Sequence, residues 1–346
     1  MNERKIKILQ AIINDYIATA EPVGSRTIAK KYDLGISSAT IRNEMSDLEE
    51  MGLIVQPHAS AGRIPSDLGY RLYVDRIMQQ KELMEDQERF LESVVARNIN
   101  QIDYLMDETA RALSKLTNYT TIISEPALKK TKLKQIRLVP LDSRSVMLVI
   151  ATEENFIRNQ IISVPQAPDD DTLNIISARI NSCLKGHTLE DIDDNTVLLL
   201  QQELGENRSM LQPILMAVEK TIHSAEKSQI HMSGTKNILG FPEFSDVEKA
   251  KDLFQTLEEK NVLVSLLGEA PQEGLQILIG NENTIQEMKG CSVIRTSYSL
   301  GDNTTGQIGI IGPTRMNYSQ VVSVLNGMVR NIEKVLRALG KDHQDP

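Results

Sequence analysis

Apolar side chains recur at helical spacing through the first fifty positions of the chain. One stripe, which predicts an amphipathic helix, consists of Ile6, Leu9, Ile13 and Ile17. This helix must end before Pro22, because the residue ahead of a proline avoids the α region. Ser25 is the expected N-cap of a short second helix, and Ser37 or Ser38 caps a third helix that ends at Gly52. Three short helices joined in this way are typical of a helix-turn-helix.

The residues after Gly52 have the pattern of a small β-hairpin. The run "LIV" predicts a strand, residues 57–63 form a loop with "SAGR" at its tip, and Ile64 begins a returning strand. Beside a helix-turn-helix, such a hairpin is the wing of a winged-helix domain. Another helix should begin near Ser66 and turn three apolar side chains inward: Leu68, Leu72 and Tyr73.

The rest of the chain alternates between helical and extended patterns. Residues 71–116 predict one or two connecting helices, with a break near "QQKELMEDQE" if there are two. From Lys132 three β-rich runs predict an antiparallel meander, and a helix follows the acidic residues 169–171. Residues 186–267 have a mostly helical pattern. Three more extended runs and a final amphipathic helix complete the chain.

These patterns predict an α+β multidomain protein in which one sheet domain is interrupted by an insertion. The extended runs on both sides of the helical block are expected to share that sheet domain. The expected boundaries are 1–75 for a winged helix-turn-helix domain, 76–118 for a helical connector, 119–167 and 269–346 for an antiparallel-sheet domain, and 168–268 for a mostly helical insert.

Composition narrows the possible functions. The formal net charge of −9 argues against a protein that coats nucleic acid with its whole surface. Local binding stays open, because exposed charges are screened beyond about 8 Å at physiological ionic strength. Two widely spaced cysteines suit a reducing compartment, and no apolar run approaches the roughly 18 residues of a membrane span. We therefore expect a cytoplasmic protein without a membrane partner.

The third predicted helix has a polar face in its N-terminal half. If Ile41 points to the core, then Ala39, Asn43 and Ser46 lie on the opposite face, flanked by Thr40 and Arg42. The N-terminal half of such a helix enters the major groove, where Asn suits adenine and Arg suits guanine. The alternative is an ordinary amphipathic helix with a solvated polar face. Asp47, at the edge of this face, has no assigned role.

The surroundings of that helix favour DNA binding. Basic residues on the preceding helix suit phosphates, as do the serines at helix N-termini. Arg63, beside Gly62 in the wing, suits a phosphate or the minor groove, although it could merely keep the hairpin soluble. The predicted DNA contacts are Ser25, Arg26, Lys30, Ser37, Ser38, Thr40, Arg42, Asn43, Ser46 and Arg63.

The sequence carries no pattern of an enzyme or a metalloprotein. The five histidines lack metal-ligand spacing, and there is no G-x-S-x-G or Walker loop. Gly306, Gly309 and Gly312 lie three apart, which suits a closely packed strand better than a phosphate-binding loop. The acidic run 169–171 suits a helix start. We expect no catalytic residues, no metal and no cofactor.

Two segments resemble the HrcA family of bacterial heat-inducible transcription repressors. They are "VGSRTIAKKYDLGISSATIRNEMSDLEEMGLIVQPHASAGRIPSDLGYRLYVD" (residues 23–75) and "GIIGPTRMNYSQVVSVL" (residues 309–325), and the order of elements extends the resemblance over the whole chain. It implies a GAF-like sheet domain interrupted by a dimerisation insert. It also implies a dimer that binds the CIRCE inverted repeat, represses the GroES-GroEL and DnaK operons, and is kept active by the GroEL chaperonin.

Two other functional classes stay open at this point. One is a winged-helix regulator whose GAF-like domain binds a small metabolite, since a fold does not fix a function. The other is an enzyme with an accessory helical head, which the missing catalytic patterns disfavour. One winged domain with few basic groups would bind DNA weakly. In a dimer, the second winged domain binds in an effectively intramolecular step, which raises the affinity.

Overall fold

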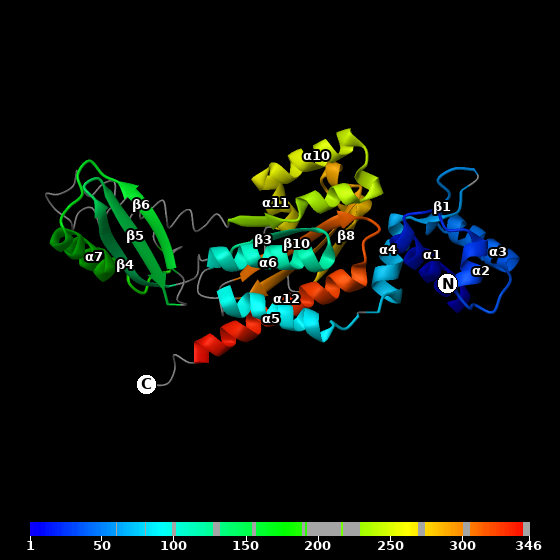
Figure 1. The fold of residues 1–346 in the computed structure, drawn as a ribbon, viewed down its shortest axis with the longest axis horizontal. Coiled ribbons are helices and arrows are strands. Elements are labelled where there is room, and N and C mark those ends of the chain that lie inside the picture. Colours follow the sequence, from blue (N-terminus) through cyan, green and yellow to red (C-terminus); the bar gives the residue numbers. More distant parts are fainter. Residues whose placement is uncertain are drawn as a thin grey trace.

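The computed structural model describes residues 1–59, 61–79, 81–98, 102–126, 132–153, 157–188, 191, 216, 229–268, 274–299 and 305–341. Figure 1 shows three parts that follow one another along the longest axis. A small helical domain with the N-terminus lies at one end, a sheet with helices on both faces lies in the middle, and a three-stranded sheet with one helix lies at the other end. The predicted α+β multidomain layout is confirmed.

The N-terminal domain is a winged helix, as the hydrophobic pattern predicted. Its elements are α1 (Glu3–Thr19), α2 (Ser25–Lys31), α3 (Ser38–Glu50) and the antiparallel pair β1 (Ile54–Val55) and β2 (Ile64–Pro65). Its core is aliphatic and fully buried around Ile12, Ile28 and Ile41. The wing strands are two residues long, so the hairpin is mostly loop.

The helix boundaries follow the predicted capping residues with one correction. The side-chain oxygen of Ser37 accepts a hydrogen bond from the backbone N–H of Thr40 at 3.1 Å and so caps α3. Gly52 follows the helix with a positive φ of 72°, as a residue after a C-cap often does. Ser25 is not an N-cap. Gly24 occupies that position, and Ser25 is the first residue of α2.

A short helical segment leads out of the winged domain. It comprises α4 (Asp67–Leu72) and a π-helical turn (Tyr73–Ile77), and Ser66 caps α4 through the N–H of Gly69 at 3.1 Å. The prediction that Leu68 turns inward is wrong, because its side chain is 55% exposed. Tyr70 takes the buried position instead and lies against the ring of Tyr318, with centroids 5.8 Å apart.

A five-stranded antiparallel sheet forms the middle of the molecule. Its order is β7-β3-β10-β9-β8, from β3 (Thr120–Ser124), β7 (Ile230–Ser233), β8 (Gln276–Ile279), β9 (Cys291–Ser299) and β10 (Thr305–Pro313). The helices around it are α5 (Glu85–Asn98), α6 (Ile102–Thr117), α10 (Val247–Glu258), α11 (Lys260–Leu267) and α12 (Tyr318–Lys341). The predicted break near "QQKELMEDQE" is confirmed, because the described residues among 78–84 are not helical. Two helices, α5 and α6, follow this break.

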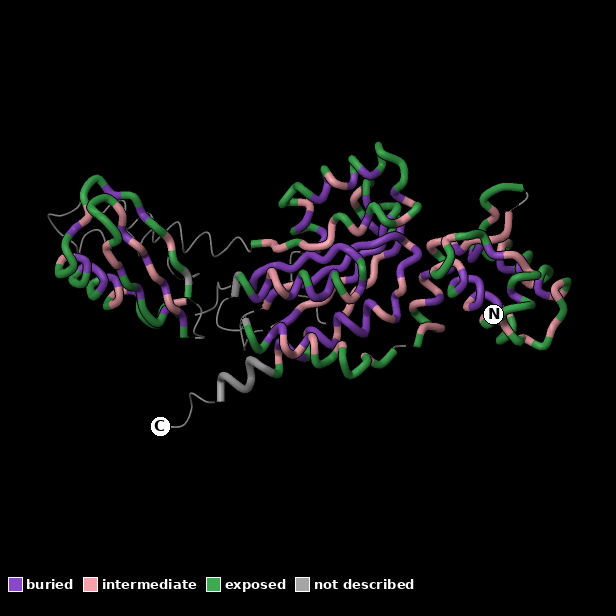
Figure 2. The backbone as a smooth tube through the Cα atoms, viewed as in Figure 1, coloured by how far each residue is buried: buried purple, intermediate pink, exposed green. Residues whose placement is uncertain are grey.

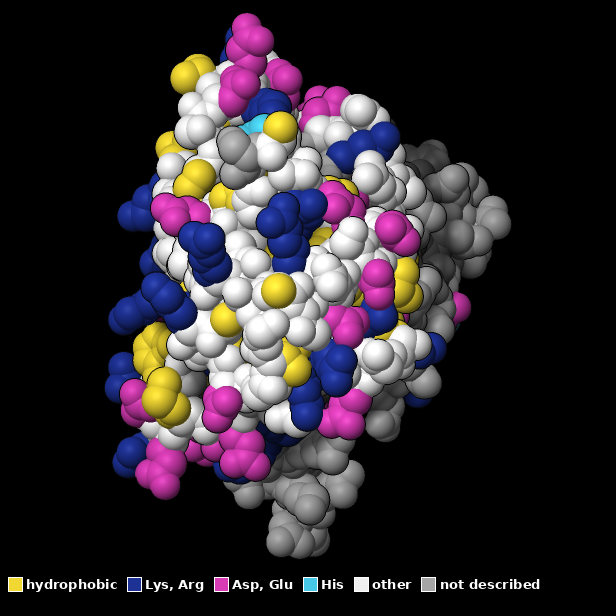
Figure 3. Space-filling view, turned by 90° about the vertical axis from the view of Figure 1, so that its right-hand side faces the viewer, with side chains coloured by type: hydrophobic (Ala, Val, Ile, Leu, Met, Phe, Trp, Pro, Cys, Tyr) yellow, Lys and Arg dark blue, Asp and Glu magenta, His cyan; other side chains and the backbone are white. Residues whose placement is uncertain are grey.

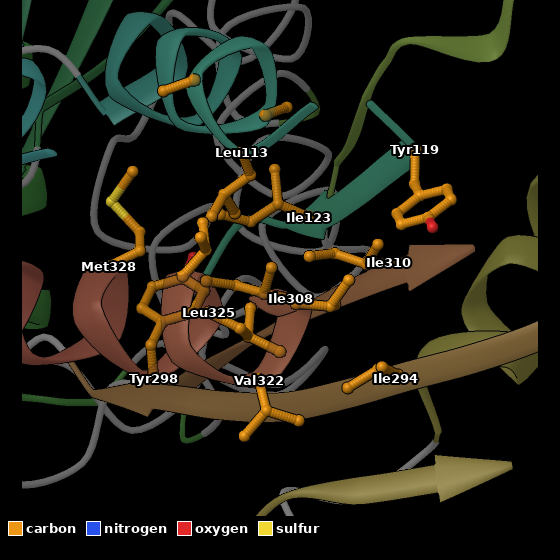
Figure 4. Close-up of a cluster of buried hydrophobic side chains, with 14 of the residues drawn as sticks. Leu113, Tyr119, Ile123, Ile294, Tyr298, Ile308, Ile310, Val322, Leu325 and Met328 are labelled. Carbon is orange, nitrogen blue, oxygen red and sulfur yellow. The ribbon is translucent and has the colours of Figure 1, made fainter. Parts of the chain in front are cut away.

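The core of the middle domain lies between the sheet and helices α6 and α12. Figure 4 shows Leu113 from α6 and Leu325 and Met328 from α12 pointing toward the sheet residues Ile123 and Ile308. All five side chains are fully buried. Figure 2 shows the same pattern as a continuous buried band through the middle strands, with exposed positions on the outer helix faces.

The glycines of β10 allow close packing, as predicted. A Cβ atom on Gly306 would lie 2.4 Å from the ring of Tyr298, and one on Gly312 would lie 2.6 Å from the ring of Tyr119. The phenol of Tyr298 is fully buried and donates to the carbonyl of Ser124 at 2.7 Å. These glycines serve packing rather than phosphate binding.

The prediction that all the extended runs share one sheet domain is wrong. Strands β4 (Leu133–Asp142), β5 (Ser145–Thr152) and β6 (Ile157–Ser163) form their own antiparallel sheet, which α7 (Asp170–Leu184) covers on one face. The meander itself and the Asp169 cap of α7 are confirmed. Alternation along a strand reports a buried face but not which sheet the strand joins. Within the predicted helical block, 186–267, the pattern missed β7, whereas α10 and α11 confirm its last part. Residues 189–190, 192–215 and 217–228 of this block lie outside the described residues.

Polar side chains join the winged domain to the middle domain. Arg71 of α4 donates from Nε to Glu282 Oε1 at 2.9 Å, and the Asp67 carboxylate accepts from the backbone N–H of Asn281 at 3.0 Å. Arg315, in the turn between β10 and α12, donates to the carbonyl of Ile17 at 3.1 Å. The joint is therefore built from specific bonds, and Glu282 in turn raises the pKa of Arg71.

One partly buried histidine ties three elements of the middle domain together. His231 of β7 contacts Glu125 beyond β3 through Nε2 at 3.2 Å and Asp107 of α6 through Nδ1 at 2.8 Å. The carboxylate of Glu125 is 1% exposed. Its hydrogen bond is the main cause that raises the pKa of His231 above the ordinary value, against the opposing effect of burial.

We expect this cluster to make the stability of the protein fall as the pH rises. A group whose pKa is raised in the folded state stabilises that state fully at pH values below its unfolded pKa, which is about 6.5 for histidine. This stabilisation is lost as the pH rises through the folded-state pKa. Thermal unfolding should therefore show a midpoint that decreases from about pH 6 upward. His231→Gln should flatten this dependence, whereas His58→Gln in the exposed wing loop should not. A pH profile that the His231 variant shares with the wild type would contradict this account.

Candidate nucleic-acid interface

Helix α3 presents its polar N-terminal half to solvent. Ile41, Met45 and Leu48 are buried against the domain core, whereas Arg42, Asn43 and the adjacent face of the helix are exposed. This orientation is the one predicted from the hydrophobic stripe. The exposed members of the predicted contact face are Ala39, Arg42, Asn43 and Ser46, and Ser38 and Thr40 are partly exposed.

Two acidic residues of α3, Glu44 and Asp47, are paired with basic residues of α1. Lys5 Nζ lies 2.8 Å from the Asp47 carboxylate and 3.0 Å from that of Glu44, and Arg4 lies 3.5 Å from Glu44. Hydrogen bonds to Asp47 and Glu44 raise the pKa of Lys5, because both carboxylates stabilise its charged form. Asp47 therefore has a role that the sequence did not reveal: its carboxylate binds α1. No spacing within α3 could have found it, because the pairing depends on how α1 packs against α3.

The cations of α2 divide into two groups. Lys31 pairs with Asp15, whose side chain is buried, and this pairing raises the pKa of Lys31. Arg26 and Lys30 are exposed, and no ion pair joins either of them to another described residue. Arg42 is in the same situation on α3. These three cations thus remain available to a phosphate or a base.

The serines and threonine at the helix starts act mainly on their own backbone. Ser37 caps α3, and its Oγ also lies 3.0 Å from Thr40 Oγ1. Ser25 and Ser38 are the first residues of α2 and α3, and each is partly exposed. Their backbone N–H groups are placed where a helix N-terminus favours an anion.

Arg63 is not at the tip of the wing. Its guanidinium binds Glu49 at the end of α3, with Nη2 2.8 Å from the carboxylate, and its backbone forms a bridge with Val23. Gly62 permits this close approach, because a Cβ there would lie 2.6 Å from the carbonyl oxygen of Val23. The arginine therefore pins the base of the wing to the residues ahead of α2. The sequence placed it in the hairpin but did not reveal Glu49 as its partner.

The outer part of the wing is an exposed loop. Its residues Pro57, His58 and Ala59 are exposed, and Gln56 Nε2 donates to the carbonyls of Ala59 and Ala61 at 3.0 and 3.1 Å. The first residue of the predicted "SAGR" tip, Ser60, lies outside the described residues. The described part of the wing offers backbone groups and small side chains rather than a basic finger.

Figure 3 looks at this end of the molecule. Lys and Arg side chains lie across the middle and along the left edge of the face, and most acidic side chains lie around its rim. The chain as a whole is acidic, at −9. Because several of the acids of the winged domain are occupied by internal ion pairs, the exposed cations are the groups free to meet the negative backbone of DNA.

We expect Lys30→Ala to weaken binding to every DNA sequence and to lower the slope of log affinity against log salt by about one. Lys30 is exposed on α2, outside the predicted recognition helix α3, so we expect it to contact a phosphate. Fluorescence anisotropy titrations at several salt concentrations measure the slope. Lys7→Ala, which removes an exposed α1 cation already paired with Glu3, is the matched control. An unchanged slope for Lys30→Ala would remove Lys30 from the interface.

Two other features, a metal site and a membrane-spanning helix, are absent from the described residues. No group of three or more His, Cys, Asp or Glu side chains is placed to hold a metal ion in the part of the chain that the structure describes. Over the same residues, no helix is both long and apolar enough to cross a membrane.

Comparisons with known proteins agree with this geometry. Residues 2–75 match the family model of the winged helix-turn-helix transcription repressor HrcA DNA-binding domain, and residues 103–322 match that of the HrcA protein C-terminal domain. A heat-inducible transcription repressor HrcA from Ruminiclostridium cellulolyticum is 44% identical over 98% of this chain and 99% of its own. The corresponding Acetivibrio thermocellus protein is 43% identical over 99% and 98%.

A solved structure has the same fold. It is a crystal structure of a hypothetical protein, with a TM-score of 0.69 and 23% sequence identity, and the match covers 98% of this chain and 99% of that one. At this identity the likeness extends to the fold alone.

Proposed function

The chain belongs to the HrcA family of heat-inducible transcription repressors, and from that premise we propose that it binds the CIRCE inverted repeat as a homodimer and represses the GroES-GroEL and DnaK operons. One observation carries the proposal: residues 38–43 of α3 contain no acid and expose Ala39, Arg42 and Asn43, whereas Glu44 and Asp47 are paired with α1. A recognition helix needs this arrangement to enter a major groove.

We assign the contacts by type. Arg42, Asn43 and Ser46 face the bases, with Thr40 beside them, while Arg26, Lys30 and the N-termini of α2 and α3 at Ser25, Ser37 and Ser38 face phosphates. Arg63 has an indirect role on this proposal, since it holds the wing against α3 through Glu49. Base contacts then set specificity, and phosphate contacts set the register.

The homodimer has a candidate surface on the three-stranded sheet. Helix α7 covers one face of this sheet, and two of its side chains bond the backbone of the β4 edge: Ser177 to Leu138 and Asn181 to Ile136. On the opposite face, Ile157 and Ile161 are 67% and 66% exposed, which is unusual for isoleucine. We propose that a second copy covers this face around its own two-fold axis.

The same face includes neighbouring apolar side chains of β5. Met147 is paired in register with Ile161, and Ala151 with Ile157, and Val149 lies between them. All three are partly exposed. Asn159 and Arg137 lie among these apolar side chains on the same face. Exposed apolar side chains gathered on one face mark an interaction site more often than a free surface. The proposed dimerisation insert therefore includes β4–β6 and α7.

A gel-shift experiment tests the DNA-binding part of the proposal. The intact inverted repeat is compared with a version in which one half-site is scrambled. A dimer with two winged heads should lose most of its affinity for the scrambled site, because the second contact is no longer specific. Equal affinity for both fragments would show that the heads do not act together.

The chaperonin part needs a separate measurement. We propose that GroEL keeps the repressor in its DNA-binding form and that misfolded proteins, by occupying GroEL during heat stress, relieve repression. Purified protein should lose operator binding on prolonged warming, and GroEL should restore it. Protein that stays folded and binds the operator equally well after warming without GroEL would contradict this regulation.

A further inference from the structure

A cavity of about 380 Å³ opens on the face of the five-stranded sheet that carries α10 and α11. Polar side chains of three neighbouring strands line its floor: Gln276 of β8, Arg295 and Ser297 of β9, and Gln307 of β10. The C-terminal end of α11 and residues 282–285 form its walls. A cavity of this size lies within the usual range for small-molecule sites, roughly 300–1,000 Å³.

The polarity of the floor is not what packing alone requires. Further along the same sheet face, Leu278, Val293 and Ile311 pack with the helices above them in an apolar cluster. At the cavity the face changes to amide and guanidinium groups. Gln307 Nε2 donates to the carbonyl of Gly268 at 2.9 Å, which uses one of the two N–H groups of its amide. Convergent polar groups in a hollow are typical of a binding site.

The charge in the cavity is that of Arg295. Its Nε donates to Gln276 Oε1 at 2.9 Å and its Nη1 to the carbonyl of Leu266 at 2.8 Å, so both partners are neutral. No ion pair joins Arg295 to a carboxylate among the described residues. Partial burial lowers the pKa of Arg295, as expected for a cation that has lost water without gaining a counter-ion.

The other charged group in the lining does not neutralise Arg295. Glu282 binds Arg71 through both carboxylate oxygens, and one of them also accepts from the backbone N–H of Ile279 at 2.8 Å. The negative charge of Glu282 is therefore paired with Arg71, at the contact between the winged domain and the middle domain. No described carboxylate pairs with Arg295. The carbonyl groups at the end of α11 offset its charge only in part, and an anionic ligand would complete the neutralisation.

We infer that this cavity binds a small organic monocarboxylate, held by the guanidinium of Arg295 and by the side-chain amides of Gln276 and Gln307. A carboxylate fits better than a phosphate, because the helix end at the cavity is the C-terminus of α11, whose carbonyl groups disfavour a second negative charge. The inference is independent of the DNA-binding proposal.

Thermal unfolding and isothermal titration of the full chain test this site. The probes are benzoate and lactate, with the neutral isostere benzamide and inorganic phosphate as comparisons. At least one carboxylate should raise the midpoint in a saturable way, and benzamide should not. If neither carboxylate binds saturably at millimolar concentrations, or if phosphate or benzamide binds as well as the better carboxylate, the inference is wrong.

Variants locate the binding. Arg295→Gln should weaken the carboxylate about tenfold to 100-fold, whereas Lys289→Gln, which removes a nearby exposed charge outside the lining, should not. Because Arg295 also bonds the end of α11, Thr284→Trp provides a second variant, which fills the mouth from an exposed position and leaves the Arg295 bonds intact. It should abolish binding. Carboxylate affinity that Thr284→Trp leaves unchanged would place the ligand elsewhere.

Discussion

Replacement of Ile161 by lysine should lower the affinity for the intact inverted repeat about 100-fold or more. The side chain is 66% exposed on the open face of the three-stranded sheet, so the change costs the fold of one chain little. In the proposed dimer it would bury two unpaired charges at the two-fold axis, which is strongly unfavourable. The winged heads would then bind independently, without the effective concentration that links them.

Sedimentation equilibrium and anisotropy titration measure the two consequences together. The Ile161→Lys protein should sediment as a monomer and bind the intact and half-scrambled repeats with similar affinity. Ile175→Lys, at a 57% exposed isoleucine of α7 rather than on the open face, is the matched control and should remain dimeric. A dimeric Ile161→Lys protein with full operator affinity would remove this face from the interface.

Arg42→Ala should cost about 1–3 kcal/mol of operator binding, which is about fivefold to 150-fold, and should relax the preference at particular base pairs. The side chain is exposed on α3 and pairs with no described acid, so its loss removes a contact with DNA without disturbing the domain. Asn43→Ala should have an effect of the same kind at different base pairs. Thermal unfolding should change little in both variants.

The matched control for Arg42 is Arg97→Ala, because Arg97 is exposed on α5, outside the winged domain. Binding to a set of operators with single base changes separates the contacts. Lost affinity that is uniform over the set would make Arg42 a phosphate contact. Unchanged affinity would mean that α3 is oriented differently from the proposal.

The helices of the winged domain and their ends could be predicted because local signals determine them. The apolar stripe of α3, the Ser37 cap and Gly52 after the last turn all act within a few residues. The exposed face of α3 followed from the same stripe. The exposure of Arg42 and Asn43 could therefore be predicted, whereas their contacts with DNA stay predictions, and the predicted Ser25 cap was wrong.

Roles that depend on distant partners could not be predicted. Asp47 binds Lys5, 42 positions earlier in the chain, and Arg63 binds Glu49 instead of extending from the wing. Ion pairs of this kind follow from packing between elements, which periodicity does not report. The three-stranded sheet is a similar case, because alternation defines the faces of a strand but not its neighbours.

Protection of guanine N7 atoms from methylation tests the central claim most directly, because N7 is accessible only in the major groove. With the intact repeat, wild-type protein should protect guanines in both half-sites, and Arg42→Ala should lose protection at specific guanines in each. Protection confined to one half-site, or wild-type binding that leaves every guanine N7 reactive, would contradict a dimer that places α3 in two major grooves.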